Sequence, residues 1–241
     1  MSDAFFTVEY LTAGYGKATV LHNVSFTLSA GSVTLLTGRN GVGKSTLMKS
    51  LIGLVPTSKA MVRLENTTLI TARKPGNPIE IARAGIGYVP EERRIFGALT
   101  VLENLEVGRQ PRRDGAPHWT VEQLFEIFPN LAERRRNQGK AMSGGEQQML
   151  TIARTLMGNP NLLLLDEPSE GIAPVIVEQM AATILKLKAE GLTVMISEQN
   201  LHFARAVADR AIIIEGGEVK FDGSFTQLEA SPEIRDAYLA V

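Results

Sequence analysis

An eight-residue run in this chain fits the phosphate-binding pattern G-x-x-x-x-G-K-[S/T]: Gly38-Arg39-Asn40-Gly41-Val42-Gly43-Lys44-Ser45. It follows the apolar stretch 33–37, which has the pattern of a buried strand, and precedes a helical stretch, 46–53. The glycines allow backbone N–H groups to approach a phosphate chain, and the helix N-terminus adds the positive end of its dipole. The run, with Thr46 after it, therefore predicts a phosphate loop in which Lys44 contacts the β- and γ-phosphates and Ser45 binds Mg²⁺.

Length and composition limit the classes of protein to consider. The chain has 241 residues, a formal net charge of −1 and no cysteine. This length predicts one large α/β domain, and the absence of cysteine excludes disulfides, thiolate metal sites and cysteine nucleophiles. Because the charge is nearly balanced, we expect no nucleic-acid surface. We identify no signal peptide and no apolar run near the ~18–20 residues that span a bilayer, so work at a membrane would need another anchor.

Hydrophobic patterning predicts the order of the elements. Alternation in the first 30 residues, at Phe6, Val8 and Tyr10 and again from Val20 to Leu28, predicts two strands. Residues 60–65 and 86–89 are expected as strands, 67–77 as a polar loop, and 99–158 as mostly helical, with the basic run 134–136 a solvated helix end. Strands and helices then alternate, which indicates a parallel sheet covered on both faces: strand 162–165, helix 174–190, strand 193–197, helix 200–208, strand 211–215, segment 218–223 and helix 232–239.

Two carboxylates end the apolar run Leu162–Leu165, namely Asp166 and Glu167. In open parallel sheets the carboxyl ends of the strands line the binding crevice, which would place this pair beside the phosphate loop. Asp166 is then expected to hold Mg²⁺, and Glu167 to act as the general base that activates water. The alternative is a strand that merely ends in a polar turn.

A second motif lies in the helical region, Met142-Ser143-Gly144-Gly145-Glu146. Ser143 and Glu146 form a capping-box pattern that predicts the start of a helix over 144–158. Beyond this local role, two glycines leave a bare helix end that attracts anions. Since the chain's own phosphate loop already holds its nucleotide, such an anion would be the phosphate of a nucleotide on another subunit.

Together these motifs resemble those of the ATP-binding cassette (ABC) ATPases, whose signature is L-S-G-G-Q. The resemblance covers essentially the whole chain in the family's order, although Met142 and Glu146 differ from the signature letters. It implies the P-loop NTPase fold of ABC ATPases, with a RecA-like parallel-sheet core, an N-terminal antiparallel β subdomain and an inserted α-helical subdomain. Residues 1–241 would form a single ABC ATPase domain, with 1–97 and 156–241 as the core and 98–155 as the helical subdomain.

The resemblance also implies a mechanism. Two cassettes would pair head to tail around two ATP molecules, each meeting the phosphate loop, Asp166 and Glu167 of one subunit and residues 143–146 of the other. ATP would then favour the closed pair over the open one, and closing would move integral membrane permease subunits. In the family an aromatic residue at the place of Tyr15 stacks on adenine, for which a tyrosine ring is suited.

The sequence departs from the family at two site positions. Glu91 stands where many members have a glutamine that contacts Mg²⁺. Its carboxylate can still reach Mg²⁺ but adds a negative charge, which Arg93 or Arg94 would offset. The alternative is that Glu91 is only a charged loop residue. Gln199 stands where many members have a switch histidine. Its amide can donate to the γ-phosphate but cannot become cationic, so slower hydrolysis is expected.

Within the family, the chain looks like one ATPase subunit of the branched-chain amino acid importers, or of the related urea and amide importers. The residues that carry this likeness are Val89–Glu91, Arg93–Phe96, Leu99–Leu105, Ser169–Pro174 and Glu198–Asn200.

This resemblance implies a second ABC ATPase subunit, permeases, and a periplasmic solute-binding protein acting indirectly, with the chain peripheral to the cytoplasmic face of the inner membrane. Residues 96–105 would line a permease groove, or simply pack as a capped helix start, since Thr100 and Glu103 also match a capping box. Two alternatives stay open: the ATPase of a lipid or lipopolysaccharide exporter, whose members typically keep the switch histidine, and a soluble ABC protein of DNA repair or translation.

Overall fold

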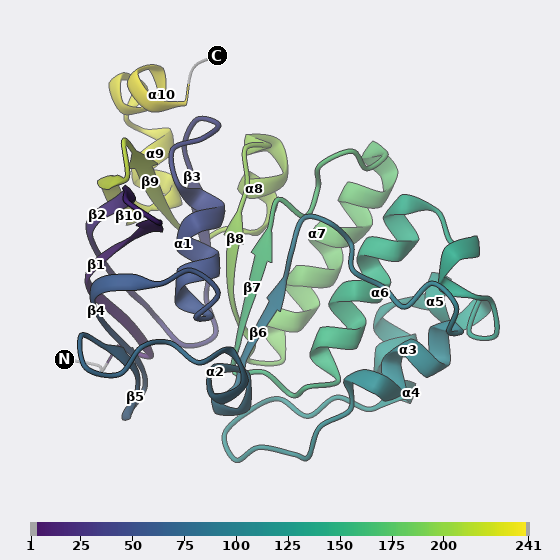
Figure 1. Ribbon diagram of the computed structural model, residues 1–241. Coiled ribbons are helices and arrows are strands. Elements are labelled where there is room, and N and C mark those ends of the chain that lie inside the picture. Colours follow the sequence, from purple (N-terminus) through teal and green to yellow (C-terminus); the bar gives the residue numbers. More distant parts are fainter. Residues whose placement is uncertain (1–3, 240–241) are drawn as a thin grey trace.

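The computed structural model describes residues 4–239 and contains two sheets (Figure 1). The smaller sheet has the strand order β2-β1-β4-β5, and its neighbouring strands run antiparallel. Its strands are β1 (Phe6–Tyr15), β2 (Ala18–Leu28), β4 (Thr57–Leu64) and β5 (Thr67–Thr71). The predicted N-terminal antiparallel sheet is therefore present.

The larger sheet has the order β10-β9-β3-β8-β7-β6 and is parallel except for β10. Successive side chains of β7 and β8 pack into different hydrophobic clusters, because neighbouring residues of a strand point to opposite faces. The fully buried apolar runs of β3, β7 and β8 thus reflect a sheet covered on both sides. The strands are β3 (Val33–Thr37), β6 (Ile86–Val89), β7 (Leu162–Asp166), β8 (Thr193–Ser197), β9 (Arg210–Glu215) and β10 (Glu218–Ser224).

Helices cover the larger sheet in two layers (Figure 1). Helix α1 (Lys44–Leu51) packs in one cluster with residues of both sheets, so it lies between them. Helices α6 (Gly144–Leu156), α7 (Pro174–Ala189) and α8 (Leu201–Val207) contribute to the cluster on the opposite face. The remaining helices are α2 (Pro78–Ala84), α3 (Val101–Gly108), α4 (Val121–Ile127), α5 (Pro129–Glu133), α9 (Phe225–Glu229) and α10 (Pro232–Tyr238).

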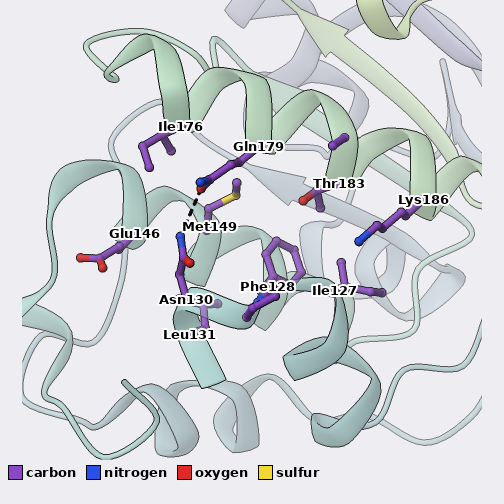
Figure 2. Close-up of a pocket in the computed structure, with 12 residues that line it drawn as sticks. Ile127, Phe128, Asn130, Leu131, Glu146, Met149, Ile176, Gln179, Thr183 and Lys186 are labelled. Carbon is purple, nitrogen blue, oxygen red and sulfur yellow. Dashed lines mark hydrogen bonds between the residues drawn. The ribbon is translucent and has the colours of Figure 1, made fainter. Parts of the chain in front are cut away.

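In the helical segment between β6 and β7, side-chain caps fix where several helices begin. Capping boxes begin α3 at Thr100, α4 at Thr120 and α6 at Ser143. The segment meets the rest of the molecule across a cavity of about 230 Å³ between α5, α6 and α7, where Asn130 Nδ2 donates to Gln179 Oε1 at 3.1 Å (Figure 2). Within residues 4–239, none of the helices combines the length and hydrophobicity needed to cross a bilayer.

Some sequence expectations were wrong. Residues 67–71 form strand β5 rather than part of a loop, because β-branched threonines fit a pleated edge even when they are polar. The alternation through Tyr10 is broken by a bulge, where Tyr10 has φ of 55° and is exposed. Helices α2 and α9 were not anticipated, and α1 begins at Lys44, two residues earlier than expected.

Candidate functional site

The phosphate loop joins β3 to α1 in a conformation that only glycine adopts readily. Gly38, Gly41 and Gly43 have φ angles of 143°, 79° and 112°. A Cβ atom on Gly38 would also lie 2.2 Å from the carbonyl oxygen of Ile214, and one on Gly43 would lie 2.8 Å from the side chain of Leu21. Backbone conformation therefore explains all three glycines of the motif, and close packing is a second reason at Gly38 and Gly43.

Lys44, the first residue of α1, is buried with its ammonium group at the centre of this loop. Lys44 Nζ donates to the carbonyl oxygens of Gly38 at 3.0 Å and Arg39 at 3.2 Å. It also forms an ion pair with Glu167 Oε1 at 3.3 Å, in which both side chains are more than nine-tenths buried. The loop thus holds the Lys44 ammonium group, surrounded by oxygen atoms, beside the carboxyl ends of the parallel strands.

Asp166 ends β7 on the other side of the loop. Its carboxylate accepts hydrogen bonds from Ser45 Oγ and from the Tyr88 hydroxyl, each at 3.1 Å. Burial raises the pKa of Asp166 above its ordinary value, and these hydrogen bonds oppose that rise. Burial and the adjacent carboxylate raise the pKa of Tyr88 strongly, so Tyr88 remains a neutral donor. Tyr88 could not be recognised from the sequence as a site residue, because the pairing of β6 with β7 brings it to Asp166.

Glu167 lies one residue beyond β7 in a left-handed backbone conformation, with φ of 47°. Its N–H group donates to the Ser197 carbonyl at 2.9 Å, which helps to hold this unfavourable conformation. Gln199 Nε2 donates both to Glu167 Oε1 at 3.1 Å and to Asn40 Oδ1 at 2.7 Å. The structure therefore brings together Lys44, Glu167 and Gln199, the three residues for which a catalytic role was predicted from the sequence.

A cavity of about 300 Å³ opens over Lys44 and Glu167 and contains Glu91 in its wall, whereas Gln199 lines a separate cavity. Burial, and after it the charges of Glu170 and Asp166, raises the pKa of Glu91. The expected compensation by arginine is wrong: Arg93 Nη2 donates to the Glu170 carbonyl at 2.8 Å, and Arg94 pairs with Glu92 instead. The lining residues are Asn40, Gly41, Gly43, Lys44, Ser45, Thr46, Glu91, Glu167 and Glu170.

The residues present fit a magnesium–nucleotide. The glycines have no side chains that would keep a phosphate chain away from the backbone N–H groups of the loop. Lys44 supplies a buried positive charge. Ser45 lines the cavity, and its hydroxyl shares a hydrogen bond with the Asp166 carboxylate, so the two oxygen ligands lie next to each other. Mg²⁺ is commonly held by one or two such protein oxygens together with phosphates and water.

Other residues expected at the site lie outside this cavity. Tyr15 ends β1 with half of its surface exposed, Arg39 Nη2 donates to the Ala237 carbonyl at 3.4 Å, and Val42 packs against the core. The capping box of Ser143 and Glu146 is present, and residues 143–146 do not line the cavity that contains Lys44.

Two arginines near residues 143–146 were not recognised from the sequence. The side chain of Arg93 lies so close to Gly144 that a Cβ atom there would meet it at 2.5 Å. Arg134, Arg135 and Arg136 are exposed just after α5, as expected for a solvated helix end, and Arg134 also forms an ion pair with Glu146. Both contacts join residues that are well separated in the chain, and no local sequence pattern predicts them.

Glu198 is a further residue that the sequence analysis left without a role. Its buried carboxylate accepts from the backbone N–H groups of Ser169 at 3.3 Å, Gln199 at 2.8 Å and Asn200 at 2.9 Å. Burial raises the pKa of Glu198, and these bonds oppose the rise. Glu198 therefore fixes the loop that carries Gln199 against the loop that follows Glu167.

We expect Glu198→Ala to lower the free energy of unfolding by about 1–3 kcal/mol, because several buried N–H groups lose their acceptor. Urea denaturation followed by circular dichroism measures this change. Glu190→Ala, an exposed position at the end of α7, is the matched control. Equal midpoints for the two variants would contradict the role given to Glu198.

Comparison with known proteins agrees with this geometry. Residues 21–170 match the family model described as ABC transporter. The high-affinity branched-chain amino acid transport ATP-binding protein BraG of Pseudomonas aeruginosa is 42% identical over 226 residues, covering 93% of this chain and 95% of BraG. The lipopolysaccharide export system ATP-binding protein LptB of Haemophilus influenzae is 34% identical, with 97% and 96% covered.

Solved structures show the same fold. The ADP conformation of MJ1267, an ATP-binding cassette of an ABC transporter, superimposes with a TM-score of 0.78 at 27% identity, covering 95% of this chain and 94% of MJ1267. The matched family model spans more than half of the chain and includes the phosphate loop, Asp166 and Glu167. The chain therefore belongs to the ABC transporter family, as an ATP-binding subunit whose hydrolysis of ATP is coupled to transport.

Proposed function

We propose that this chain is an ATPase subunit of an importer for branched-chain amino acids or a similar small polar solute. The observation that carries the proposal is the 42% identity to BraG over nearly the full length of both chains. The identity to LptB is lower, and Gln199 departs from the histidine typical of exporters of that kind. Export of lipid or lipopolysaccharide is therefore the second candidate.

In the proposed reaction, residues 38–46 bind the phosphates of ATP and Lys44 contacts the β- and γ-phosphates. Ser45 and Asp166 hold Mg²⁺, with Glu91 as a further oxygen ligand; the ion supplies neutralisation of the charge that develops on the phosphoryl oxygens. Glu167 accepts a proton from the attacking water. Gln199 orients the base through its bond to Glu167, and it exchanges its bond to Asn40 for one to the γ-phosphate.

The same proposal assigns the other residues predicted from the sequence. Two cassettes pair head to tail, and residues 143–146 of each meet the γ-phosphate of the ATP bound by the other. The exposed ring of Tyr15 stacks on adenine. Residues 98–155 act as a helical subdomain attached to the nucleotide-binding core formed by 1–97 and 156–241.

A second cavity, of about 660 Å³, is the proposed site for a permease segment. Exposed apolar side chains line it from three directions, Ile79 of α2, Phe96 before α3 and Val107 within α3. Arg154 of α6 lies over the Phe96 ring, 4.8 Å from its centre. Because the cavity combines α2 with helices of the segment 98–155, a permease bound there at the cytoplasmic face of the membrane would sense their relative movement.

Transport tests this proposal. In a host lacking this gene, uptake of radiolabelled leucine, isoleucine and valine at low concentration is expected to fall and to return with the wild-type gene but not with the Lys44→Ala variant. Co-purification with two permeases and a different cassette would support the assembly. Normal uptake together with loss of surface lipopolysaccharide would favour the exporter instead.

We expect Gln199→His to preserve or raise the turnover of the assembled transporter. A histidine has nitrogen donors in a similar place and can also carry a positive charge beside the γ-phosphate. Gln199→Ala, which removes the bonds to Asn40 and Glu167, should lower kcat by about tenfold. Steady-state ATPase assays measure both changes, and complete loss of activity in Gln199→His would show that Gln199 is wrongly placed.

A further inference from the structure

The ion pair between Arg134 and Glu146 joins the basic run after α5 to the first turn of α6. Arg134 Nε lies 2.7 Å from Glu146 Oε1, and Glu146 Oε2 accepts from the Ser143 N–H at 2.8 Å. Each carboxylate oxygen thus has its own partner. The Glu146 side chain is 14% exposed, whereas that of Arg134 is 47% exposed.

The position of the Glu146 carboxylate affects the charge at the N-terminal end of α6. Glu146 is the third residue of α6, so its negative charge lies at the helix end whose N–H groups are suited to bind an anion. In the proposed pair of cassettes this end meets the γ-phosphate of the partner's ATP. An uncompensated carboxylate there would repel that phosphate, and the repulsion would grow as closure excludes water.

We propose that Arg134 is a positioning residue for ATP-driven pairing: its guanidinium neutralises Glu146 and thereby allows residues 143–146 to accept the γ-phosphate bound by the partner cassette. This inference rests on the proposed function. It accounts for a glutamate at a position where the family signature has a neutral glutamine, because the opposite charge comes from the same chain, twelve positions earlier.

A purely structural role for the pair is less well supported. A surface ion pair with one partner half exposed contributes only about 0–1 kcal/mol to stability. Helix α5 is also held independently, by the buried Leu131 and by the bond from Asn130 to Gln179 of α7 (Figure 2). Loss of Arg134 should therefore leave α5 in place while exposing the charge of Glu146.

The test is a double-mutant cycle on the purified transporter complex, with Arg134→Gln, Glu146→Gln, both together, and Arg136→Gln as the matched control. Arg136 belongs to the same basic run and is exposed. We expect Arg134→Gln to raise the KM for ATP about 2- to 5-fold, a factor in the range of a single partly exposed charge interaction. Glu146→Gln should restore a low KM in the double variant, since no negative charge then remains to be neutralised.

Several outcomes separate the possibilities. Higher ionic strength should lessen the Arg134→Gln defect, because salt screens the repulsion. Equal KM values for Arg134→Gln and Arg136→Gln, or additive effects in the double variant, would overturn the inference. A fall in melting temperature that Glu146→Gln does not reverse would assign the pair a structural role and would also overturn it. Ser143→Arg tests the pairing itself: if it leaves ATPase activity intact, the proposed head-to-tail pair fails, not merely the role of Arg134.

Discussion

Lys44→Ala is expected to weaken binding of magnesium–ATP by at least about 100-fold. The substitution removes a buried ammonium group, which takes the ion-pair partner from Glu167 and a donor from the carbonyls of Gly38 and Arg39. With ATP bound, Lys44 would pair with the phosphates; truncating one partner of such a buried charge pair costs roughly 2–5 kcal/mol of binding, and about 1.4 kcal/mol corresponds to a tenfold change in affinity. Titration calorimetry with ATP measures the loss directly.

Two further variants make the Lys44 result interpretable. Lys59→Ala removes an exposed lysine on β4, whose ammonium group lies over the Tyr10 ring, and should leave ATP affinity unchanged. Lys44→Ala combined with Glu167→Gln removes the unpaired charge, so it should regain stability without regaining affinity. Unchanged affinity in Lys44→Ala alone would refute the role given to this residue.

The sheet core and the phosphate loop could be predicted because their signals are local. The strands β3, β7 and β8 are short, fully buried and mostly apolar, and the glycines of the loop lie in one eight-residue motif. Asp166 is the last residue of β7 and Glu167 is the next residue in the chain. For these elements, the chemistry and the residues that position it are close together in the chain.

The missed elements had weak or conflicting local signals. Helix α2 is only seven residues long, although Asn77 caps it and the left-handed Gly85 ends it. Strand β5 is rich in threonine and was interpreted as a loop because polarity was given more weight than β-branching. Short elements of this kind depend on tertiary packing more than on their own sequence.

The missed site contacts are long-range. Tyr88 reaches Asp166 across 78 positions of the chain, and Arg93 reaches the carbonyl of Glu170 across 77. The spacing of these residues in the sequence does not predict that they meet. The pairing of β6 with β7 and the course of the following loops determine the contacts. Arg93 and Arg94 were expected to offset the charge of Glu91 because they lie close to it in the sequence. That proximity did not predict the direction of either side chain.

Glu167→Gln is expected to lower kcat for ATP hydrolysis by about 10²- to 10³-fold, the range associated with loss of a general base. The new amide has nearly the same shape, and its oxygen can still accept from Lys44 and from Gln199. The backbone at position 167 should also keep its conformation, since the bond to the Ser197 carbonyl does not involve the side chain. Binding of ATP should therefore persist while proton abstraction from water is lost.

This combination predicts that the Glu167→Gln variant accumulates in an ATP-bound, paired state. Size-exclusion chromatography with light scattering, with and without magnesium–ATP, would detect the pairing in the presence of the partner cassette, and a single-turnover assay would measure the chemical step. Glu178→Gln, an exposed glutamate on α7, is the matched control and should hydrolyse ATP at the wild-type rate. If Glu167→Gln also turned over normally, the base would have to be another group, although the Glu167 carboxylate lines this cavity and contacts both Lys44 and Gln199.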